Sequence, residues 1–277
     1  MIPPVALSIA GSDPSGGAGI QADLKTFTAL GVYGAAVLAG LTVQNTQGVR
    51  AAVGVDPALV RDQVAAVLDD LPVAATKIGM LSNADVAGAV ADLIEERRAD
   101  FGLIVLDPVM VATSGDALLT DDAVAVIRDR LMPLADVITP NLPEAAVLLG
   151  TATADGPDDV AAQAEALVRA GARAALVKGG HLDGDELGDA FATPDDVTVL
   201  RSRRIETRNT HGTGCTLSSA IAACAARRGE TPDTGVSAGA VEEARAYLWR
   251  AIESAKDWQL SRSPETGHGP VDHLHAG

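Results

Sequence analysis

The sequence lacks the features that typically mark secreted or membrane proteins. It has only two cysteines, Cys215 and Cys224, too few for a disulfide framework, so a reduced cytoplasmic setting is expected. No basic segment precedes an apolar run at the N-terminus, which argues against a signal peptide. The longest uncharged run, residues 26–49, carries glycines and a polar cluster at 44–47, so no membrane span is predicted.

Positive charge is also scarce. Lys+Arg number 21 against 37 Asp+Glu, which gives a formal net charge of −16. A protein that binds nucleic acid needs a basic face, so no nucleic-acid partner is expected. Only four lysines occur, which draws attention to the place of each in the sequence: Lys25, Lys77, Lys178 and Lys256.

The sequence does contain ample core material, with 47% hydrophobic residues in 277 and no linker-like stretch, which predicts one domain over 1–277. Short apolar runs alternate with helical patterns, and this alternation predicts an α/β fold with a mostly parallel sheet and helices on both faces. The expected strands are 5–10, 35–43, 73–78, 102–107, 135–140, 172–178 and 196–200. The expected helices begin after Asp56 and at Asn83 and Asp121, and cover 158–170, 214–228 and 236–256. The polar segments 181–189 and 201–209 are expected to be surface loops around a β-hairpin.

Polar or glycine-rich clusters follow nearly every expected strand. Since ligands of open α/β sheets bind outside the carboxyl ends of the strands, these clusters should form one rim that holds the site. Turn residues are common at strand ends, but Gln44, Glu144 and Lys178 are not residues that turns require. The clusters are GSDPSGGAG from Gly11, QNT from Gln44, KIGM from Lys77, DPVM from Asp107, TPNLPE from Thr139 and KGGH from Lys178.

The segment THGTGCTLSSAIAACAA at 210–226 predicts a deeply packed helix that begins at a glycine-rich turn. The free N–H groups of a helix N-terminus form an anion site. Cys215 lies in this first turn, where the thiol pKa is expected to fall, whereas Cys224 is expected to be a buried small hydrophobic residue.

Three further groups complete the candidate site. Asp107 ends a buried strand, where its charge requires a metal ion or a cationic partner. Asn141 and Glu144 have the spacing of a capping box, a role that is compatible with metal binding. Lys178 precedes two glycines and would reach phosphate oxygens. Together with the anion site, these groups indicate phosphoryl transfer to a small molecule, which depends mainly on positioning and charge neutralisation.

The glycine-rich segment from Gly11 is neither a Walker A motif nor a dinucleotide-binding GxGxxG. It is expected to bring Asp13 and the helical Asp23 to the rim, although spacing alone also allows Asp23 to be a solvated helical carboxylate.

The motifs, in this order, resemble the hydroxymethylpyrimidine and phosphomethylpyrimidine kinases of thiamine biosynthesis, members of the ribokinase-like superfamily. The resemblance runs over essentially the whole chain and implies a three-layer sandwich. It rests on AGSDPSGGAGIQADLKT from Ala10, QNT from Gln44, TKIGML from Thr76, DPVM from Asp107, TPNLPEA from Thr139, VKGGH from Val177, NTHGTGCTLSSAI from Asn209 and GHGPVDHLHA from Gly267.

The resemblance implies two successive phosphorylations that use ATP and Mg²⁺. The first converts 4-amino-5-hydroxymethyl-2-methylpyrimidine to its monophosphate and the second yields the diphosphate. It implies that Gln44, Asp23, Met80 and Gly11 bind the pyrimidine, and that Asp107 and Glu144 hold Mg²⁺. It assigns ATP to Lys178, Asn141 and Thr210, and the anion hole to His211, Gly212, Thr213, Gly214 and Cys215. Cys215 would act as the base for the first step.

Three alternatives remain at this point. A pyridoxal or pyridoxine kinase would use the same loop chemistry, a non-catalytic metabolite-binding protein would keep the fold without the reaction, and a dehydrogenase would need a GxGxxG that is missing. Relatives suggest a homodimer. The histidines of the C-terminal tail, His268, His273 and His275, are expected to pack across the site or a dimer contact rather than bind metal.

Overall fold

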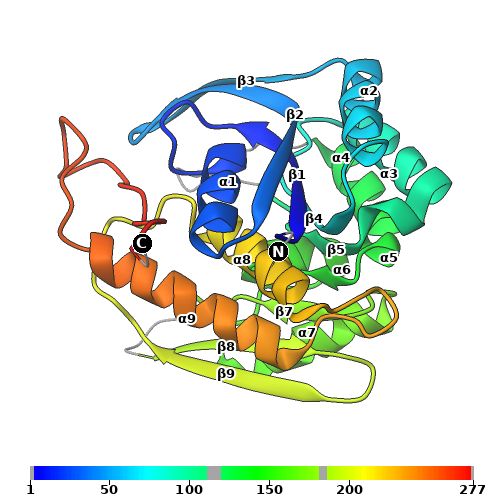
Figure 1. The fold of residues 1–277 in the computed structure, drawn as a ribbon. Coiled ribbons are helices and arrows are strands. Elements are labelled where there is room, and N and C mark those ends of the chain that lie inside the picture. Colours follow the sequence, from blue (N-terminus) through cyan, green and yellow to red (C-terminus); the bar gives the residue numbers. More distant parts are fainter. Residues whose placement is uncertain (1–2, 111–119, 181–185, 276–277) are drawn as a thin grey trace.

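The computed structural model describes residues 3–110, 120–180 and 186–275, which form a nine-stranded sheet in the order β3-β2-β1-β4-β5-β6-β7-β8-β9 (Figure 1). Six neighbouring strands, β2, β1, β4, β5, β6 and β7, run parallel to one another. β3 pairs antiparallel at one edge, and β8 and β9 pair antiparallel at the other. The strands are β1 (Val5–Ser12), β2 (Tyr33–Asn45), β3 (Gly48–Gly54), β4 (Val73–Ile78), β5 (Leu103–Leu106), β6 (Val137–Ile138), β7 (Ala175–Val177), β8 (Glu186–Ala192) and β9 (Val197–Arg203).

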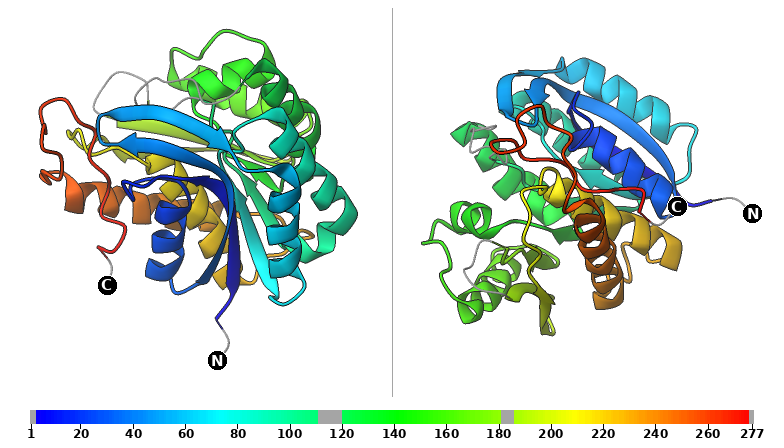
Figure 2. Two further views of the ribbon diagram at one scale, coloured as in Figure 1. Left: turned by 90° about the horizontal axis from the view of Figure 1, so that it is seen from above. Right: turned by 90° about the vertical axis from the view of Figure 1, so that its left-hand side faces the viewer.

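Helices cover both faces of the sheet, which makes the predicted three-layer sandwich (Figure 2). One face is covered by α1 (Gly19–Ala29), α8 (Thr213–Arg228) and α9 (Ala238–Ala255). The other is covered by α2 (Pro57–Leu68), α3 (Ala84–Arg97), α4 (Asp121–Val126), α5 (Met132–Leu134), α6 (Leu142–Leu149) and α7 (Pro157–Arg169). Two short helical turns, η1 (Arg98–Phe101) and η2 (Ile127–Leu131), complete this layer.

Two hydrophobic cores lie between these layers, one on each face of the sheet. Along β1, Leu7 and Ile9 belong to the core beneath α2 and α3, whereas Ala6 belongs to the core beneath α8 and α9. Both kinds of position are buried because helices cover the strand on each side, and this double burial produces the continuous apolar runs in the sequence. No helix in the described part of the chain is long and apolar enough to span a membrane.

The predicted helix starts are largely confirmed. The Asp56 side chain caps α2 and the Asn83 side chain caps α3 through backbone N–H groups. α6 begins with a complete capping box between Asn141 and Glu144. The helix expected from Asp121 begins there, but Pro133 lies near its end, and since proline has no N–H to donate, the chain passes through the widened turn η2 before α5.

Two strands were not predicted. β3 is an edge strand whose residues are mostly exposed, so it lacks the apolar run that marks a buried strand. β8 includes Gly188 and Asp189, which are uncommon in strands, and it forms the hairpin with β9 where 181–189 was expected to be a loop. Residues 181–185 of that expected loop lie outside the described residues. The second expected loop begins later than predicted because β9 extends to Arg203.

Candidate active site

The N-terminus of α8 lies at the carboxyl ends of the parallel strands, as predicted. Gly212 precedes the helix with φ of 79°, and a side chain there would collide with the carbonyl oxygen of Gly17, so this approach requires glycine. The N–H of Thr213 donates to the Thr210 carbonyl, whereas Gly214 and Cys215 are first-turn residues whose N–H groups have no acceptor within the helix. This helix start therefore has the geometry of an anion site.

Lys178 and Asp107 form an ion pair beside the helix start, with Nζ 3.1 Å from Oδ1. Asp107 also accepts hydrogen bonds from the hydroxyls of Thr139 and Ser218. Gly214 lies against the pair, since a Cβ there would be 3.4 Å from Lys178 Nζ and 3.6 Å from Asp107 Oδ2. The predicted anion site, lysine and first carboxylate are thus brought together.

Glu144 completes this cluster. Burial raises the pKa of its carboxyl group to about 7, where the charge of Lys178 lowers the pKa and that of Asp107 raises it. One oxygen accepts the Asn141 N–H at 2.8 Å and the other accepts the Met110 N–H at 3.4 Å. An isolated parallel β-bridge pairs the main chains of Asn141 and Lys178, which follow β6 and β7. Within the described ranges, no three His, Cys, Asp or Glu side chains group as a metal site, so this carboxylate pair is the candidate.

The residues expected to bind the pyrimidine ring lie around the ends of β1, β2 and β4. The Met80 side chain fills the space that Gly11 leaves, since a Cβ on Gly11 would be 2.3 Å from Met80 Cε. Met80 is 9% exposed and offers an apolar wall, and Gln44, half-buried near the end of β2, offers an amide. The structure therefore brings Gly11 and Met80 into contact.

Asp23 lies behind this site. Its carboxylate accepts hydrogen bonds from Ser8 at 2.6 Å and Ser219 at 2.6 Å, and both oxygens are 2.9 Å from Lys77 Nζ. Asp23 and Lys77 are completely buried. This arrangement argues against the direct contact with substrate expected from the sequence, and it also excludes a solvated helical carboxylate. Sequence reasoning missed Lys77 as its partner, although a lysine within a buried strand requires one.

His211 also departs from its expected role. Its backbone N–H donates to the Gly269 carbonyl at 3.0 Å, and its Nε2 is 2.8 Å from Asp13 Oδ2. Neither group points to the anion site, so the structure separates His211 from the other four residues of that set.

The expected fall of the Cys215 pKa is wrong. Burial raises the pKa of this thiol to about 11, against the opposing effects of the Lys77 charge and of the Gly19 N–H. Desolvation of the thiolate therefore outweighs the helix N-terminus. Cys224 is fully buried in α8, as predicted.

The C-terminal tail packs against the first turns of α8 and against α9. His273 Nε2 contacts Thr216 Oγ1 at 3.1 Å in the first turns of α8, and the Tyr247 hydroxyl donates to the His273 carbonyl at 2.6 Å. Burial lowers the pKa of His273 to about 4, which keeps the ring neutral near pH 7.

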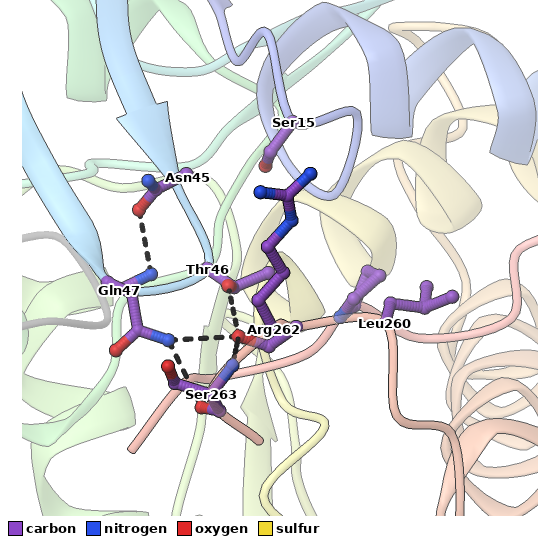
Figure 3. Close-up of a pocket in the computed structure, with 9 residues that line it drawn as sticks. Ser15, Asn45, Thr46, Gln47, Leu260, Arg262 and Ser263 are labelled. Carbon is purple, nitrogen blue, oxygen red and sulfur yellow. Dashed lines mark hydrogen bonds between the residues drawn. The ribbon is translucent and has the colours of Figure 1, made fainter. Parts of the chain in front are cut away.

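A pocket opens where the tail meets the glycine-rich loop and the β2–β3 turn (Figure 3). Ser261 Oγ accepts hydrogen bonds from Thr46 at 3.1 Å and Gln47 at 2.9 Å, which ties the tail to the turn. The Arg262 guanidinium points toward Ser15 across this pocket (Figure 3). The lining residues are Ser15, Asn45, Thr46, Gln47, Leu260, Ser261, Arg262, Ser263 and Pro270.

A parallel α/β sheet with a helix-terminal anion site, a lysine and two carboxylates at its carboxyl edge defines a phosphotransferase of small molecules. Comparison with known proteins narrows this class. The family model described as Phosphomethylpyrimidine kinase matches residues 13–272, and the chain belongs to this family of kinases.

Two curated relatives match almost end to end. The hydroxymethylpyrimidine/phosphomethylpyrimidine kinase of Rhizobium meliloti is 53% identical over 274 residues, covering 98% of this chain and 97% of the relative. The enzyme of the same name from Escherichia coli is 45% identical over 271 residues, covering 98% and 97%.

Solved structures agree on the fold. A phosphomethylpyrimidine kinase from Clostridium difficile is 37% identical with a TM-score of 0.77, over 90% of this chain and 99% of that one. A pyridoxal kinase from Bacillus subtilis in complex with ADP is 34% identical with a TM-score of 0.84, over 98% of both chains. The fold is therefore ribokinase-like.

Proposed function

We propose that the protein phosphorylates 4-amino-5-hydroxymethyl-2-methylpyrimidine with ATP and then phosphorylates the resulting monophosphate to the diphosphate. The observation that carries the proposal is the contact of the α8 N-terminus with the Lys178–Asp107 pair, since a phosphoryl group in transit needs fixed positive groups on its oxygens. The names of the relatives at 53% and 45% identity supply the substrate class.

The pyrimidine ring would lie between Met80 and Gln44. Gly11 leaves space for the Met80 methyl group, so the thioether forms an apolar wall, and the Gln44 amide can pair with a nitrogen-containing ring edge. Asp23 would act indirectly, because its carboxylate is engaged by Lys77, Ser8 and Ser219.

ATP phosphates would be held by Lys178, with Asn141 and Thr210 beside them. Burial would lower the pKa of Lys178, but the charges of Asp107 and Glu144 raise it above its usual value, so the ammonium group stays charged. The N–H groups of Gly212, Gly214 and Cys215 would face the transferring phosphoryl group, with Thr213 in the same turn.

Asp107 and Glu144 would hold Mg²⁺. Two carboxylates suit this ion, which usually takes one or two from the protein and completes its shell with water and phosphate oxygens. Burial raises the pKa of Glu144 to about 7, so a cation bound beside it would stabilise the ionised carboxylate. The bound ion would neutralise charge on the phosphates.

Cys215 would accept the hydroxymethyl proton in the first step. With a pKa of about 11, only a small fraction of the thiol is thiolate near pH 7, and the Lys77 charge favours that fraction. In the second step the attacking phosphate oxygen is already anionic, so it requires no base there.

A phosphotransfer assay tests the proposal against its nearest rival. Pyridoxal kinases of the same fold, with TM-scores of 0.84 and 0.85, make vitamin B6 alcohols the competing substrates. We expect kcat/KM for the pyrimidine to exceed that for pyridoxine or pyridoxal by at least about tenfold, which corresponds to about 1.4 kcal/mol of transition-state binding. A preference for the vitamin B6 compounds would overturn the substrate assignment.

We also propose a cytoplasmic homodimer. The two cysteines are free thiols, as expected in a reducing compartment. Leu41, Val43 and Val53 expose 51%, 56% and 64% of their surface on the β2–β3 hairpin, an apolar area that a second copy could cover. Light scattering at micromolar concentration tests the dimer, and cell fractionation tests the compartment.

A further inference from the structure

His211 is held in one orientation by its surroundings. Its main chain is fixed by the hydrogen bond to Gly269, and its Nε2 lies 2.8 Å from Asp13 Oδ2. The ring packs on Gly17, where a Cβ would be 2.5 Å from His211 Cδ2, so only glycine leaves room for the imidazole. Only 6% of the surface of His211 is exposed, so little water competes with Asp13 for the ring nitrogen.

The contact with Asp13 fixes which nitrogen of His211 carries a hydrogen. The carboxylate already accepts hydrogen bonds from the Ser15 hydroxyl and from the N–H groups of Gly17 and Ala18. Burial alone would raise the pKa of Asp13, but the bonds from His211 and Ser15 lower it to about 2, so it is ionised near pH 7. An anionic oxygen at 2.8 Å requires a donor, and Nε2 therefore carries the hydrogen.

Gln44 lies on the other side of the same nitrogen, and here the donors conflict. Its amide nitrogen is 3.4 Å from His211 Nε2, which would set two donors against each other. Its amide oxygen is 3.2 Å from Thr42 Oγ1. The Thr42 hydroxyl gives its single hydrogen to the Ser12 carbonyl at 2.9 Å, so the Thr42 and Gln44 oxygens face each other as two acceptors. Turning the amide by 180° exchanges its oxygen and nitrogen. The NH₂ group then donates to Thr42 Oγ1, and the amide oxygen faces the His211 N–H. The one hydrogen of that N–H goes mainly to Asp13 Oδ2 and is shared with the amide oxygen as the longer branch of a three-centre hydrogen bond.

We propose that Asp13 and His211 are positioning residues that hold the Gln44 amide with its oxygen toward His211 and its NH₂ toward Thr42. This inference rests on the proposed function, because it assigns the way in which Gln44 reads the substrate. One lone pair of the amide oxygen and one N–H of the amide remain free to bind the ligand. The acceptor then lies on the His211 side of the amide and the donor on the Thr42 side.

That order selects a substrate edge on which a donor is followed by an acceptor. The amino group and adjacent ring nitrogen of the aminopyrimidine supply such an edge, with the amino group on the His211 side. The 4-oxo analogue, 5-hydroxymethyl-2-methylpyrimidin-4-one, carries the reversed order, because its oxygen accepts and its ring N–H donates. A freely turning Gln44 could pair with either compound, whereas a fixed one pairs with the first.

The test compares kcat/KM for these two compounds in the wild type, H211L, H211Q and T42V. The wild type should prefer the aminopyrimidine by about 100-fold or more, as expected where a wrong ligand leaves buried polar groups unpaired. H211L should lower this ratio at least tenfold, mainly by raising KM for the aminopyrimidine. H211Q retains a donor that can reach Asp13, so it should keep the ratio even if its activity falls.

T42V is a second route to the same result, since valine preserves the shape of the side chain and removes the oxygen that accepts the Gln44 NH₂. It should lower the ratio while leaving the KM for ATP within about twofold of wild type. A merely structural role for His211 would lower kcat/KM for both compounds equally, and an unchanged ratio in folded H211L and T42V would overturn the inference. A wild type that uses neither compound would instead overturn the proposed function.

Discussion

Lys77 Nζ lies 2.9 Å from both carboxylate oxygens of Asp23, and both side chains are completely buried beneath the candidate site. Burial would lower the pKa of Lys77, but the charges of the Asp23 and Asp107 carboxylates raise it above its usual value. The pair therefore remains charged and joins β4 to α1.

Removing one partner of this pair should be costly. K77M would leave the Asp23 carboxylate buried with only the Ser8 and Ser219 hydroxyls, so we expect the free energy of unfolding to fall by about 3–5 kcal/mol. Chemical denaturation at pH 7 measures this loss.

The matched control is R169M, which breaks the exposed helical pair of Arg169 with Glu165. Exposed pairs of this kind contribute less than about 1 kcal/mol. A K77M variant no less stable than R169M would show that the buried pair contributes little.

These residues also show how far the sequence could predict the site. Asp107, Glu144 and Lys178 follow strands, and the carboxyl ends of parallel strands must meet at one edge, so their clustering was predictable. The partner of Asp23 was not, because sequence spacing does not show which way a helical carboxylate faces. The Cys215 pKa was misjudged since it depends on how completely the helix start is buried, a property of packing rather than of local pattern.

The edge strands illustrate the same limit for the fold. β5 is buried on both faces and has a continuous apolar sequence, and the apolar sequence of the buried β4 is interrupted only by Thr76 and Lys77. β3 gains its structure from pairing with β2, and its residues 50–53 are exposed, so no hydrophobic period marks it.

His273 should make the protein less stable in mild acid. Burial lowers its pKa from 6.5 to about 4, so the unfolded chain takes up a proton more readily than the folded one. Above pH 6.5 His273 is neutral in both states and costs no stability. As the pH falls toward 4, the free energy of unfolding decreases by up to about 3 kcal/mol.

H273Q isolates this effect, because glutamine can still donate to Thr216 but does not titrate. The stability difference between wild type and H273Q, followed by denaturation from pH 7 to pH 4, should shift against the wild type. Parallel curves for the two proteins would contradict the assignment.

Cys215 should affect the two phosphorylation steps unequally. If the thiolate accepts the hydroxymethyl proton, C215A should slow alcohol phosphorylation by about 10²–10⁴-fold and phosphate phosphorylation by less than about tenfold. Because the thiol pKa is about 11, the first step in the wild type should also accelerate between pH 7 and pH 9, by up to about tenfold per pH unit. Each step is measured with its own substrate, and equal losses in both would leave Cys215 as an anion-hole residue only.

Lys178 should be required for the use of ATP. K178M removes the charge beside the α8 N-terminus and should lower kcat/KM for ATP by about 10²–10³-fold. K256M is the control, since Lys256 pairs with Glu253 on the surface. Circular dichroism of both variants verifies that they fold, and equal activities would exclude Lys178 from the phosphate site.

The most direct measurement follows both products over time, with ATP, Mg²⁺ and 4-amino-5-hydroxymethyl-2-methylpyrimidine. The account predicts that the monophosphate forms first and is then converted to the diphosphate, with two ATP consumed per pyrimidine. Accumulation of the monophosphate without diphosphate, or no pyrimidine-dependent use of ATP, would contradict it.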